Sequence, residues 1–177
     1  MAFPSLSIGD LTAKMPIVQG GMGVGISLSG LASAVANQGG IGVIAGAMIG
    51  MKEPDVAKNP IEANLRALRQ ELTKAREKTQ GIIGVNIMVA LTTFSQMVRT
   101  AIENRADIIF SGAGLPLEMP KHLLQACEEK KEEFKTKLVP IVSSARAATL
   151  IARKWLSRFD YPVSYTHLRA HETDSYL

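Results

Sequence analysis

The sequence predicts an α/β fold built on a parallel sheet, and three observations lead to that prediction. Apolar segments alternate with helical segments five times along the chain. The run Ile41-Gly-Val-Ile-Ala45 has no polar alternation, which is typical of a strand covered on both faces. Turns rich in glycine or serine follow several of the predicted strands. Five strand-helix units in succession favour one sheet with right-handed crossovers.

The composition is that of one globular domain, with 177 residues, 46% of them hydrophobic and 20% charged. The net charge of +4 is small and the Lys and Arg residues are interspersed with Glu, so we expect no nucleic-acid partner. Because there is no apolar run of ~20 residues and no signal-peptide pattern, we expect a cytoplasmic protein with no membrane partner. The single cysteine, Cys127, excludes an internal disulfide, and we predict that it is a small buried side chain on a helix.

The first segments predict a hairpin, a strand and a helix. Residues 3–14 form two short alternating segments around Gly9-Asp10, a pattern typical of a β-hairpin. Ile17-Val18 is predicted to begin the first core strand. The next helix is predicted to start with Ser29 as its N-cap and to stop at Asn37-Gln-Gly-Gly, where glycine supplies a left-handed C-cap. We expect that helix to bury three side chains: Leu31, Ala34 and Val35.

A long amphipathic helix is predicted to begin at Pro60. Asn59 as N-cap, Pro60 in the first turn and Glu62 three residues after the cap are helix-start signals. One face carries the apolar residues, which are Ile61, Leu65, Leu68 and Leu72. The opposite face is expected to be solvated and carries Arg66, Arg69, Glu71, Lys74, Arg76, Glu77 and Lys78.

The alternation then repeats to residue 158. Strands are predicted over 82–89, 107–110 and 138–142, and helices over 94–104, 120–134 and 145–158. Pro140 is an objection to the last strand, because proline removes a hydrogen bond from a central strand.

The C-terminal segment differs from the rest of the chain. Residues 162–177 have no helix or strand periodicity and hold two of the three His and two of the three Tyr residues. They resemble a translated sequencing adapter. We therefore divide the chain into a domain over 1–161 and a non-native or disordered tail over 162–177.

The glycine-rich turn Gly20 to Gly25 fits neither common nucleotide-binding motif. Ile26 and Leu28 stand where a Rossmann fingerprint needs Gly or Ala, and no Gly-Lys-Ser/Thr exists for a Walker A loop. Two interpretations remain. The glycines bring backbone N–H groups close to a flat ligand, or they form a tight turn with no ligand.

Further polar or side-chain-poor residues end the later strands. Asn86 needs partners for its amide, which a heteroaromatic ring edge or neighbouring backbone would provide. Ser111-Gly-Ala-Gly-Leu-Pro116 follows the fourth strand, and Ser143-Ser144 follows the fifth, with Ser144 predicted to cap a helix and Ser143 to face the site. Four loops at one end of the strands are expected of a (β/α)8 TIM barrel active site.

We assign no catalytic residue and no metal site. His122 is expected on the surface, and His167 and His171 lie in the tail. The methionines are expected to fill the core rather than to line a pocket, and these are Met22, Met48, Met51 and Met88.

The motifs resemble the nitronate monooxygenases, formerly called 2-nitropropane dioxygenases, an FMN-dependent TIM-barrel family. The resemblance rests on Pro16-Ile-Val-Gln-Gly-Gly-Met-Gly-Val-Gly, Gly40-Ile-Gly-Val-Ile, Gly84-Val-Asn-Ile-Met-Val-Ala and Ser111-Gly-Ala-Gly-Leu-Pro, within residues 5–161. It implies FMN at the carboxyl ends of the strands. The implied cofactor-binding residues are Gln19, Gly20, Gly21, Met22, Asn86 and Ser143. The implied substrate-side residues are Gly112, Ala113, Gly114, Leu115 and Pro116.

The resemblance also implies that about five N-terminal βα units of the barrel are present. The family's Gly-Gly-His motif and its phosphate-binding loops, which follow strand five in relatives, do not occur here. We therefore expect an N-terminal fragment, inactive alone, of a cytoplasmic enzyme that oxidises alkyl nitronates with O2, the full-length protein being a possible homodimer. The alternatives are an FMN-dependent enoyl-ACP reductase that also uses NAD(P)H, a non-catalytic half-barrel, and a phosphate-ligand barrel without flavin.

Overall fold

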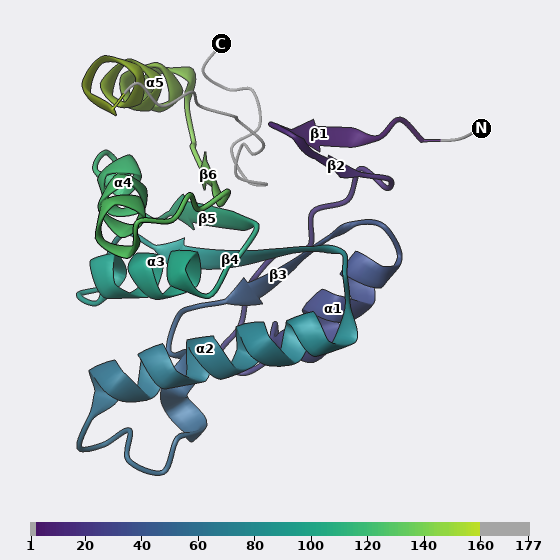
Figure 1. The fold of residues 1–177 in the computed structure, drawn as a ribbon, viewed down its shortest axis with the longest axis vertical. Helices are drawn as coiled ribbons and strands as arrows, with labels where there is room; N and C mark the ends of the chain where they lie inside the picture. The colour runs from purple at the N-terminus through teal and green to yellow at the C-terminus, as the bar shows by residue number, and fades with distance from the viewer. Residues whose placement is uncertain (1–2, 160–177) are drawn as a thin grey trace.

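The computed structural model describes residues 3–159 (Figure 1). The predicted tail over 162–177 and the domain boundary at residue 161 lie outside these residues. No helix within the described range is long and apolar enough to cross a bilayer.

The predicted parallel sheet is present and has four strands in the order β3-β4-β5-β6. These are β3 (Ile41–Ala45), β4 (Ile82–Met88), β5 (Ile108–Gly112) and β6 (Lys137–Pro140). Each strand pairs in parallel with the next one along the chain. The strand-helix alternation is therefore confirmed, and the sheet is the frame on which the loops at its carboxyl edge are placed.

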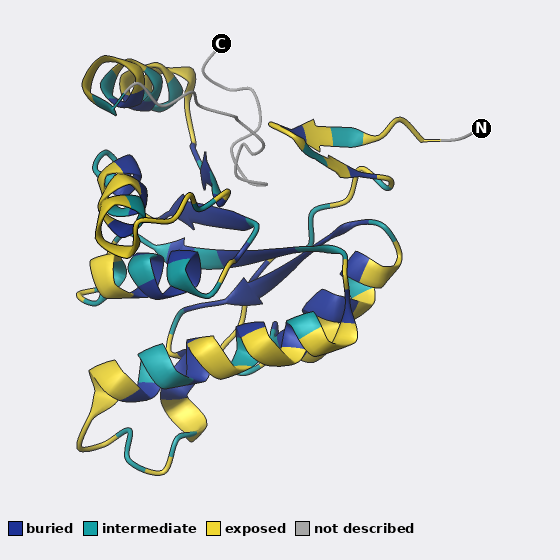
Figure 2. Cartoon of the chain, in the orientation of Figure 1, coloured by how far each residue is buried: buried dark blue, intermediate teal, exposed yellow. Residues whose placement is uncertain are grey.

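The helices cover one face of this sheet (Figure 1). They are α1 (Ser29–Asn37), the 3₁₀ helix η1 (Ile49–Lys52), α2 (Pro60–Lys78), α3 (Phe94–Glu103), α4 (Met119–Lys130) and α5 (Ala145–Phe159). The larger core lies between the helices and the strands, and the buried ribbon of the sheet in Figure 2 marks it. Its largest members include Leu68, Leu72, Ile83, Met97 and Trp155.

A β-hairpin covers the other face, as the sequence predicts. It consists of β1 (Leu6–Ile8) and β2 (Leu11–Ala13), and Gly9 adopts a left-handed φ of 60° in the turn. Ile8 packs into a second apolar cluster with buried residues of β3, β5 and β6, including Val43 and Phe110, and Ile82 of β4 packs against the same cluster. Asp10 Oδ1 lies 2.5 Å from the Nζ atom of Lys137, the first residue of β6. The hairpin therefore covers the amino-terminal part of this inner face and leaves the carboxyl ends of the strands to the loops.

The predicted strand at Ile17-Val18 is reduced to an isolated parallel bridge between Val18 and Ile41. The backbone makes two ladder bonds, from Ile41 N to Ile17 O at 2.9 Å and from Gln19 N to Ile41 O at 3.0 Å. At the next step the side chain of Gln19 takes over: its Oε1 accepts from Val43 N at 3.0 Å and its Nε2 donates to Val43 O at 3.1 Å. The strand at Ile17-Val18 is short because the side chain of Gln19, and not further backbone, pairs with Val43 of β3.

The predicted buried face of α1 is wrong. Leu31 and Ala34 are exposed and Val35 is half-buried. The residues that face the core are Ser29, Ala32, Ser33 and Ala36. A Cβ atom on Gly42 would lie 1.8 Å from the backbone O of Ala32, so α1 rests directly on β3 and small residues must line the contact.

The ends of α1 also differ in part from the prediction. Leu28 is the N-cap residue, and no side chain of its own caps the helix. The N–H of Ser29 instead donates to Glu71 Oε2 of α2 at 2.9 Å, so the cap comes from another helix. The glycine C-terminus is confirmed, since Gly39 has a φ of 84° directly after the C-cap Gln38.

Helix α2 begins at Pro60 as predicted, but without the expected side-chain cap on Asn59. Leu68 and Leu72 are buried, whereas Ile61 is 47% exposed. The charged face is only partly solvated, because Arg66 pairs with both Glu53 and Asp55 in the segment before the helix.

The last units follow the prediction with shifted boundaries. Helix α4 begins at Met119 and ends at Lys130, where Lys131 adopts a left-handed φ of 53°. Pro140 is tolerated in β6 because the sheet needs no N–H at that position. The N–H of Lys137 donates to Asp107 O and the N–H of Ile141 donates to Ser111 O, and residue 140 lies between two residues that donate to β5. Cys127 is half-buried in α4, and its Sγ lies 3.5 Å from Phe134 N.

Candidate functional site

The loops that follow the strands meet at the carboxyl edge of the sheet, as the sequence predicts. A Cβ on Gly21 of the first loop would lie 2.6 Å from Val43 Cγ1 of β3 and 3.0 Å from Asn86 Cβ of β4. A Cβ on Gly114, in the loop after β5, would lie 2.9 Å from Val89 Cβ in the loop after β4. Only glycine fits at these two positions, because neighbouring loops are already in contact there.

Asn86 links β4 to the glycine-rich loop. Its Nδ2 donates to the backbone O of Gly21 at 2.9 Å and lies 3.8 Å from Met22 Sδ. The sequence left two partners open for the Asn86 amide, a ligand ring or neighbouring backbone. The amide N–H of Asn86 bonds backbone. Its Oδ1 receives no donor from residues 3–159, so an acceptor remains at the carboxyl edge.

Gly21 itself carries a polar group that the fold does not satisfy. The residue is buried, and its N–H has no acceptor within the described part of the chain. Buried N–H groups are nearly always paired, so an unpaired one next to Asn86 indicates a place for a ligand atom. Of the turn glycines, Gly23 and Gly25 adopt positive φ values of 81° and 70°.

The side-chain amide of Gln19 is fully bonded within the protein. Both ends of its amide are bonded to the backbone of Val43, and Nε2 is also 3.1 Å from Gly20 O. The Gln19 side chain therefore extends the sheet and positions Gly20. Its amide has no free group left to bond a cofactor.

Ser27 is a further candidate site residue, which none of the sequence motifs includes. It is 3% exposed, and its Oγ lies 2.7 Å from Met22 O, 3.3 Å from Gly20 O and 3.2 Å from Met22 N. Its backbone O accepts from Ala45 N at 2.8 Å. A serine shortly after a run of glycines often bonds nearby backbone, and this local tendency is the one sequence signal that could have identified Ser27.

The methionine prediction is wrong for three of its four residues. Met22 is 68% exposed and Met48 and Met51 are each 50% exposed, while Met88 is half-buried. The glycine-rich loop also exposes Val24 and Ile26. The carboxyl edge thus presents apolar side chains to its surroundings instead of burying them.

The loop after β5 has a strained backbone and a fixed end. Ala113 adopts a left-handed φ of 55°, which is uncommon for a residue other than glycine. Gly112 is buried, whereas Ala113, Gly114 and Leu115 are exposed. Pro116 is buried, and its carbonyl accepts from Trp155 Nε1 at 3.0 Å. Gly112 to Leu115 lie at the edge, and Pro116 anchors them to α5.

Of the two serines after β6, Ser144 caps α5 as predicted. Its Oγ accepts from Ala147 N at 3.2 Å. Ser143 is exposed, but no hydrogen bond joins it to Gly21, Met22 or Asn86. The structure thus brings Gly21, Met22 and Asn86 together, and the contact of Ser143 with a cofactor stays a prediction.

His122 is partly buried rather than fully exposed on the surface. It is half-buried in α4, and its ring meets the ring of Phe94 edge-on with centroids 6.3 Å apart. Burial, with Lys121 nearby, lowers the pKa of His122 below its usual range. It is part of the packing between α3 and α4 and does not take part in the edge described above.

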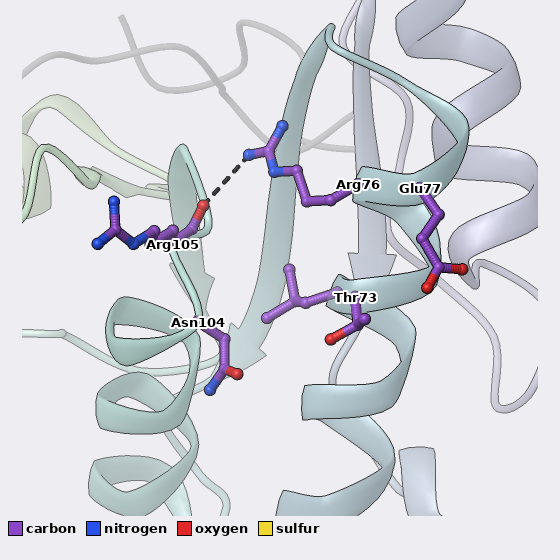
Figure 3. A pocket seen from close by; sticks show the side chains of 6 residues that line it. Thr73, Arg76, Glu77, Asn104 and Arg105 are labelled. Carbon is purple, nitrogen blue, oxygen red and sulfur yellow. Dashed lines mark hydrogen bonds between the residues drawn. The ribbon is translucent and has the colours of Figure 1, made fainter.

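A cavity of about 420 Å³ lies at the opposite, amino-terminal edge of the sheet, between the ends of α2 and α3 (Figure 3). Arg76 crosses it and donates to the backbone O of Gly81 and of Arg105 and to Asp107 Oδ2, at 3.0, 3.2 and 2.6 Å. Asp107 Oδ2 also accepts from Ile83 N at 2.7 Å. These contacts hold the starts of β4 and β5, and residues at this edge of such barrels serve stability.

The parallel sheet has helices on its outer face and glycine- and serine-rich loops at its carboxyl edge. This is the arrangement of five βα units of a (β/α)8 TIM barrel. The chain matches the model of the nitronate monooxygenase family over residues 5–163 and belongs to that family, whose members are flavin-dependent oxidoreductases.

Two solved structures are similar to the chain. They are FabK from Thermotoga maritima, with 28% identity and a TM-score of 0.57, and its M276A mutant, with 27% identity and a TM-score of 0.57. The matches cover 78% of this chain, but 37% and 40% of those chains, so the chain spans about two fifths of their length. No curated protein matches the chain.

Proposed function

We propose that this chain forms the FMN-binding first part of an enzyme that oxidises alkyl nitronates with O2. Membership of the nitronate monooxygenase family over residues 5–163 supports the reaction type. FMN would accept electrons from the nitronate and pass them to O2, and the protein would supply binding, orientation and exclusion of side reactions.

The observation that carries the proposal is the pair of unsatisfied groups at the carboxyl edge. The buried N–H of Gly21 lacks an acceptor and Asn86 Oδ1 lacks a donor within residues 3–159, and the two residues are joined at 2.9 Å. One edge of the flavin ring offers carbonyl acceptors and an N–H donor in alternation, so its chemistry matches both groups. These residues therefore fit FMN.

In this proposal some of the predicted residues contact the flavin directly and others position them or border the substrate. Gly20, Gly21, Met22 and Asn86 would contact the ring. Gln19 would act indirectly, by holding Gly20. The substrate would lie toward Gly112, Ala113, Gly114 and Leu115, while Ser143 would border the cofactor on the side of β6. The exposed apolar side chains of Met22, Val24 and Ile26 would exclude water from the ring.

A second candidate is FMN-dependent enoyl-ACP reduction, which the similarity to FabK favours. The test uses the complete barrel protein that contains this segment. Oxygen uptake that depends on an alkyl nitronate, without NAD(P)H, is expected. Consumption of NAD(P)H with a crotonyl thioester and no uptake with nitronate would overturn the proposal in favour of the reductase.

The 177-residue chain alone is a third candidate, a half-barrel with no activity. Its support is that the chain spans 37% of FabK and that no described strand pairs with the outer edge of β6. We expect the purified chain to be colourless. A flavin absorbance at ~1:1 stoichiometry would contradict this expectation, because retention of a cofactor needs a completed site.

A further inference from the structure

The carbonyl groups at the start of the glycine-rich loop are all occupied by donors from the protein. Gly20 O accepts from Gln19 Nε2 at 3.1 Å and from Met22 N at 2.9 Å, with Ser27 Oγ at 3.3 Å. Gly21 O accepts from Asn86 Nδ2 at 2.9 Å. Met22 O accepts from Ser27 Oγ at 2.7 Å. No carbonyl of these three residues is left without a protein donor.

The N–H groups of the same loop show the opposite pattern. Among the described residues, the N–H groups of Gly20, Gly21 and Gly23 have no acceptor. Met22 N–H is the exception, since it bonds Gly20 O and Ser27 Oγ. Over residues 20–23 the loop thus offers N–H donors but no free carbonyl, since Gly23 O accepts from Ile26 N at 3.3 Å. Such clusters of backbone N–H groups favour ligand atoms that carry negative charge.

Ser27 contributes to this pattern, because its hydroxyl is the donor to Met22 O, for which the described residues offer no other donor. Its hydroxyl takes a position inside the loop, and its backbone O bonds Ala45 N at the end of β3. A cation stands nearby, because a Cβ on Gly25 would lie 3.7 Å from Lys52 Nζ, and Lys52 has no ion-pair partner among residues 3–159. Both features add positive potential at the same loop.

We propose that Ser27 is a positioning residue that makes the loop bind reduced FMN more tightly than oxidised FMN. Ser27 donates to Met22 O at 2.7 Å, with Gly20 O at 3.3 Å from the same hydroxyl, so these carbonyls face the protein. The N–H groups of Gly20, Gly21 and Gly23 are left for the flavin edge that becomes anionic on reduction. The inference rests on the proposed FMN site but goes beyond it, because it assigns a residue that does not touch the cofactor to the control of its redox state.

The test measures the Kd of oxidised FMN and, without oxygen, the Kd of reduced FMN in the complete barrel protein. Ser27→Ala is expected to weaken the binding of reduced FMN about tenfold more than the binding of oxidised FMN, a difference of about 1.4 kcal/mol. Ser27→Thr keeps the hydroxyl and is expected to restore the wild-type ratio. Ser33→Ala removes a comparably buried hydroxyl that bonds Gly30 O, outside the site, and is expected to leave the ratio unchanged.

Several results would overturn the inference. Equal weakening of both redox states by Ser27→Ala would mean that Ser27 only stabilises the fold. If Ser27→Ala does not fold, Ser27→Cys keeps a side chain of similar size whose S–H is only a weak donor, and it must shift the same ratio; an unchanged ratio then contradicts the inference. A wild-type protein that binds no FMN refutes the proposed function as well, whereas FMN binding without a shifted ratio refutes only the role of Ser27.

Discussion

Gln19 extends the sheet by one step with its side chain instead of its backbone. Its amide supplies an acceptor and a donor to Val43, which is 1% exposed, and so replaces a neighbouring strand at the point where the chain turns away at Gly20. The first loop can therefore leave the sheet without unsatisfied backbone groups on β3. At the scale of single residues, the Gln19 side chain thus sets the point at which the glycine-rich loop leaves the sheet.

Replacing Gln19 by Leu tests this role. Leu has a similar volume but bonds neither Val43 N nor Val43 O, and leaving buried polar groups unpaired costs about 2 kcal/mol. We expect that loss in the free energy of unfolding measured with urea. Gln70→Leu, at an exposed position of α2, is the matched control and is expected to change stability by less than about 0.5 kcal/mol. Equal effects of the two substitutions would contradict the role of Gln19.

Glu71 predicts a pH dependence. Burial raises the pKa of its carboxyl, but Lys74 and the Ser29 N–H together lower the pKa more, so the net result lies below the ordinary value of 4.5. The folded chain then binds fewer protons than the unfolded chain between the two pKa values. The stabilisation by Glu71 is therefore complete above pH 4.5 and is lost as the pH falls through the lowered pKa.

The corresponding variant is Glu71→Gln. Urea unfolding at a series of pH values should show the variant to be less stable at pH 7, with a difference that closes as the pH falls below the lowered pKa. Glu62→Gln removes a carboxylate from an exposed ion pair with Arg69 and should show little difference at any pH. A Glu71→Gln difference that stays constant from pH 7 to pH 3 would disprove the linkage.

At the scale of elements, the contact between α1 and β3 sets the position of the glycine-rich loop, because the loop ends where α1 begins. The contact is unusually close at Gly42, where Ala32 O occupies the space that a Cβ would need. Helix α1 therefore presents Ala and Ser to the sheet and leaves Leu31 exposed. Backbone approach, rather than apolar side chains, determines which face of this helix is buried.

A pair of glycine substitutions tests the close approach. Gly42→Ala places a methyl group 1.8 Å from Ala32 O and is expected to cost about 3 kcal/mol of stability or more. Gly30→Ala, within α1, meets no atom within 4 Å and should stabilise the helix by up to about 1 kcal/mol. Thermal unfolding of both variants gives the comparison. A Gly42→Ala variant as stable as the wild type would refute the packing.

At the scale of the whole molecule, the two faces of the sheet have different partners, and the two edges have different tasks. Helices cover one face and the hairpin covers the amino-terminal part of the other (Figure 1). Arg76 and Asp107 close the amino edge with hydrogen bonds, while the carboxyl edge keeps unsatisfied groups and exposed apolar side chains. The contacts that stabilise the sheet and the candidate binding groups thus lie at opposite ends of the same strands.

Ile8 tests whether the hairpin belongs to the cooperative fold. It is 2% exposed and packs with Val43, Phe110 and Val139. Ile8→Ala should lower the free energy of unfolding by about 2–4 kcal/mol, the usual cost of a large-to-small change in a core. Ile17→Ala, at a 54% exposed position, should cost less than about 1 kcal/mol. A loss at Ile8 no larger than at Ile17 would show that the hairpin is a separate unit.

Features that depend on local pattern could be predicted from the sequence. The hairpin around Gly9-Asp10, the buried strand Ile41–Ala45 and the start of α2 at Pro60 all follow from turn chemistry, apolar runs and helix-start signals. The convergence of the loops at the carboxyl edge could also be predicted, because consecutive parallel strands must end at the same side.

The tertiary structure decided what distant residues do to one another. Sequence periodicity could not show that Glu71 caps α1, that Gln19 completes β3, that Asn86 bonds Gly21 O, or that Met22, Met48 and Met51 are exposed. Each depends on partners from segments far apart in the chain or on how an element is turned against its neighbours. The sequence by itself determined an α/β chain with a glycine-rich loop at its reactive edge. Only the fold decided which atoms of that loop remain free to bind, because hydrogen bonds and close packing across the sheet occupy the rest.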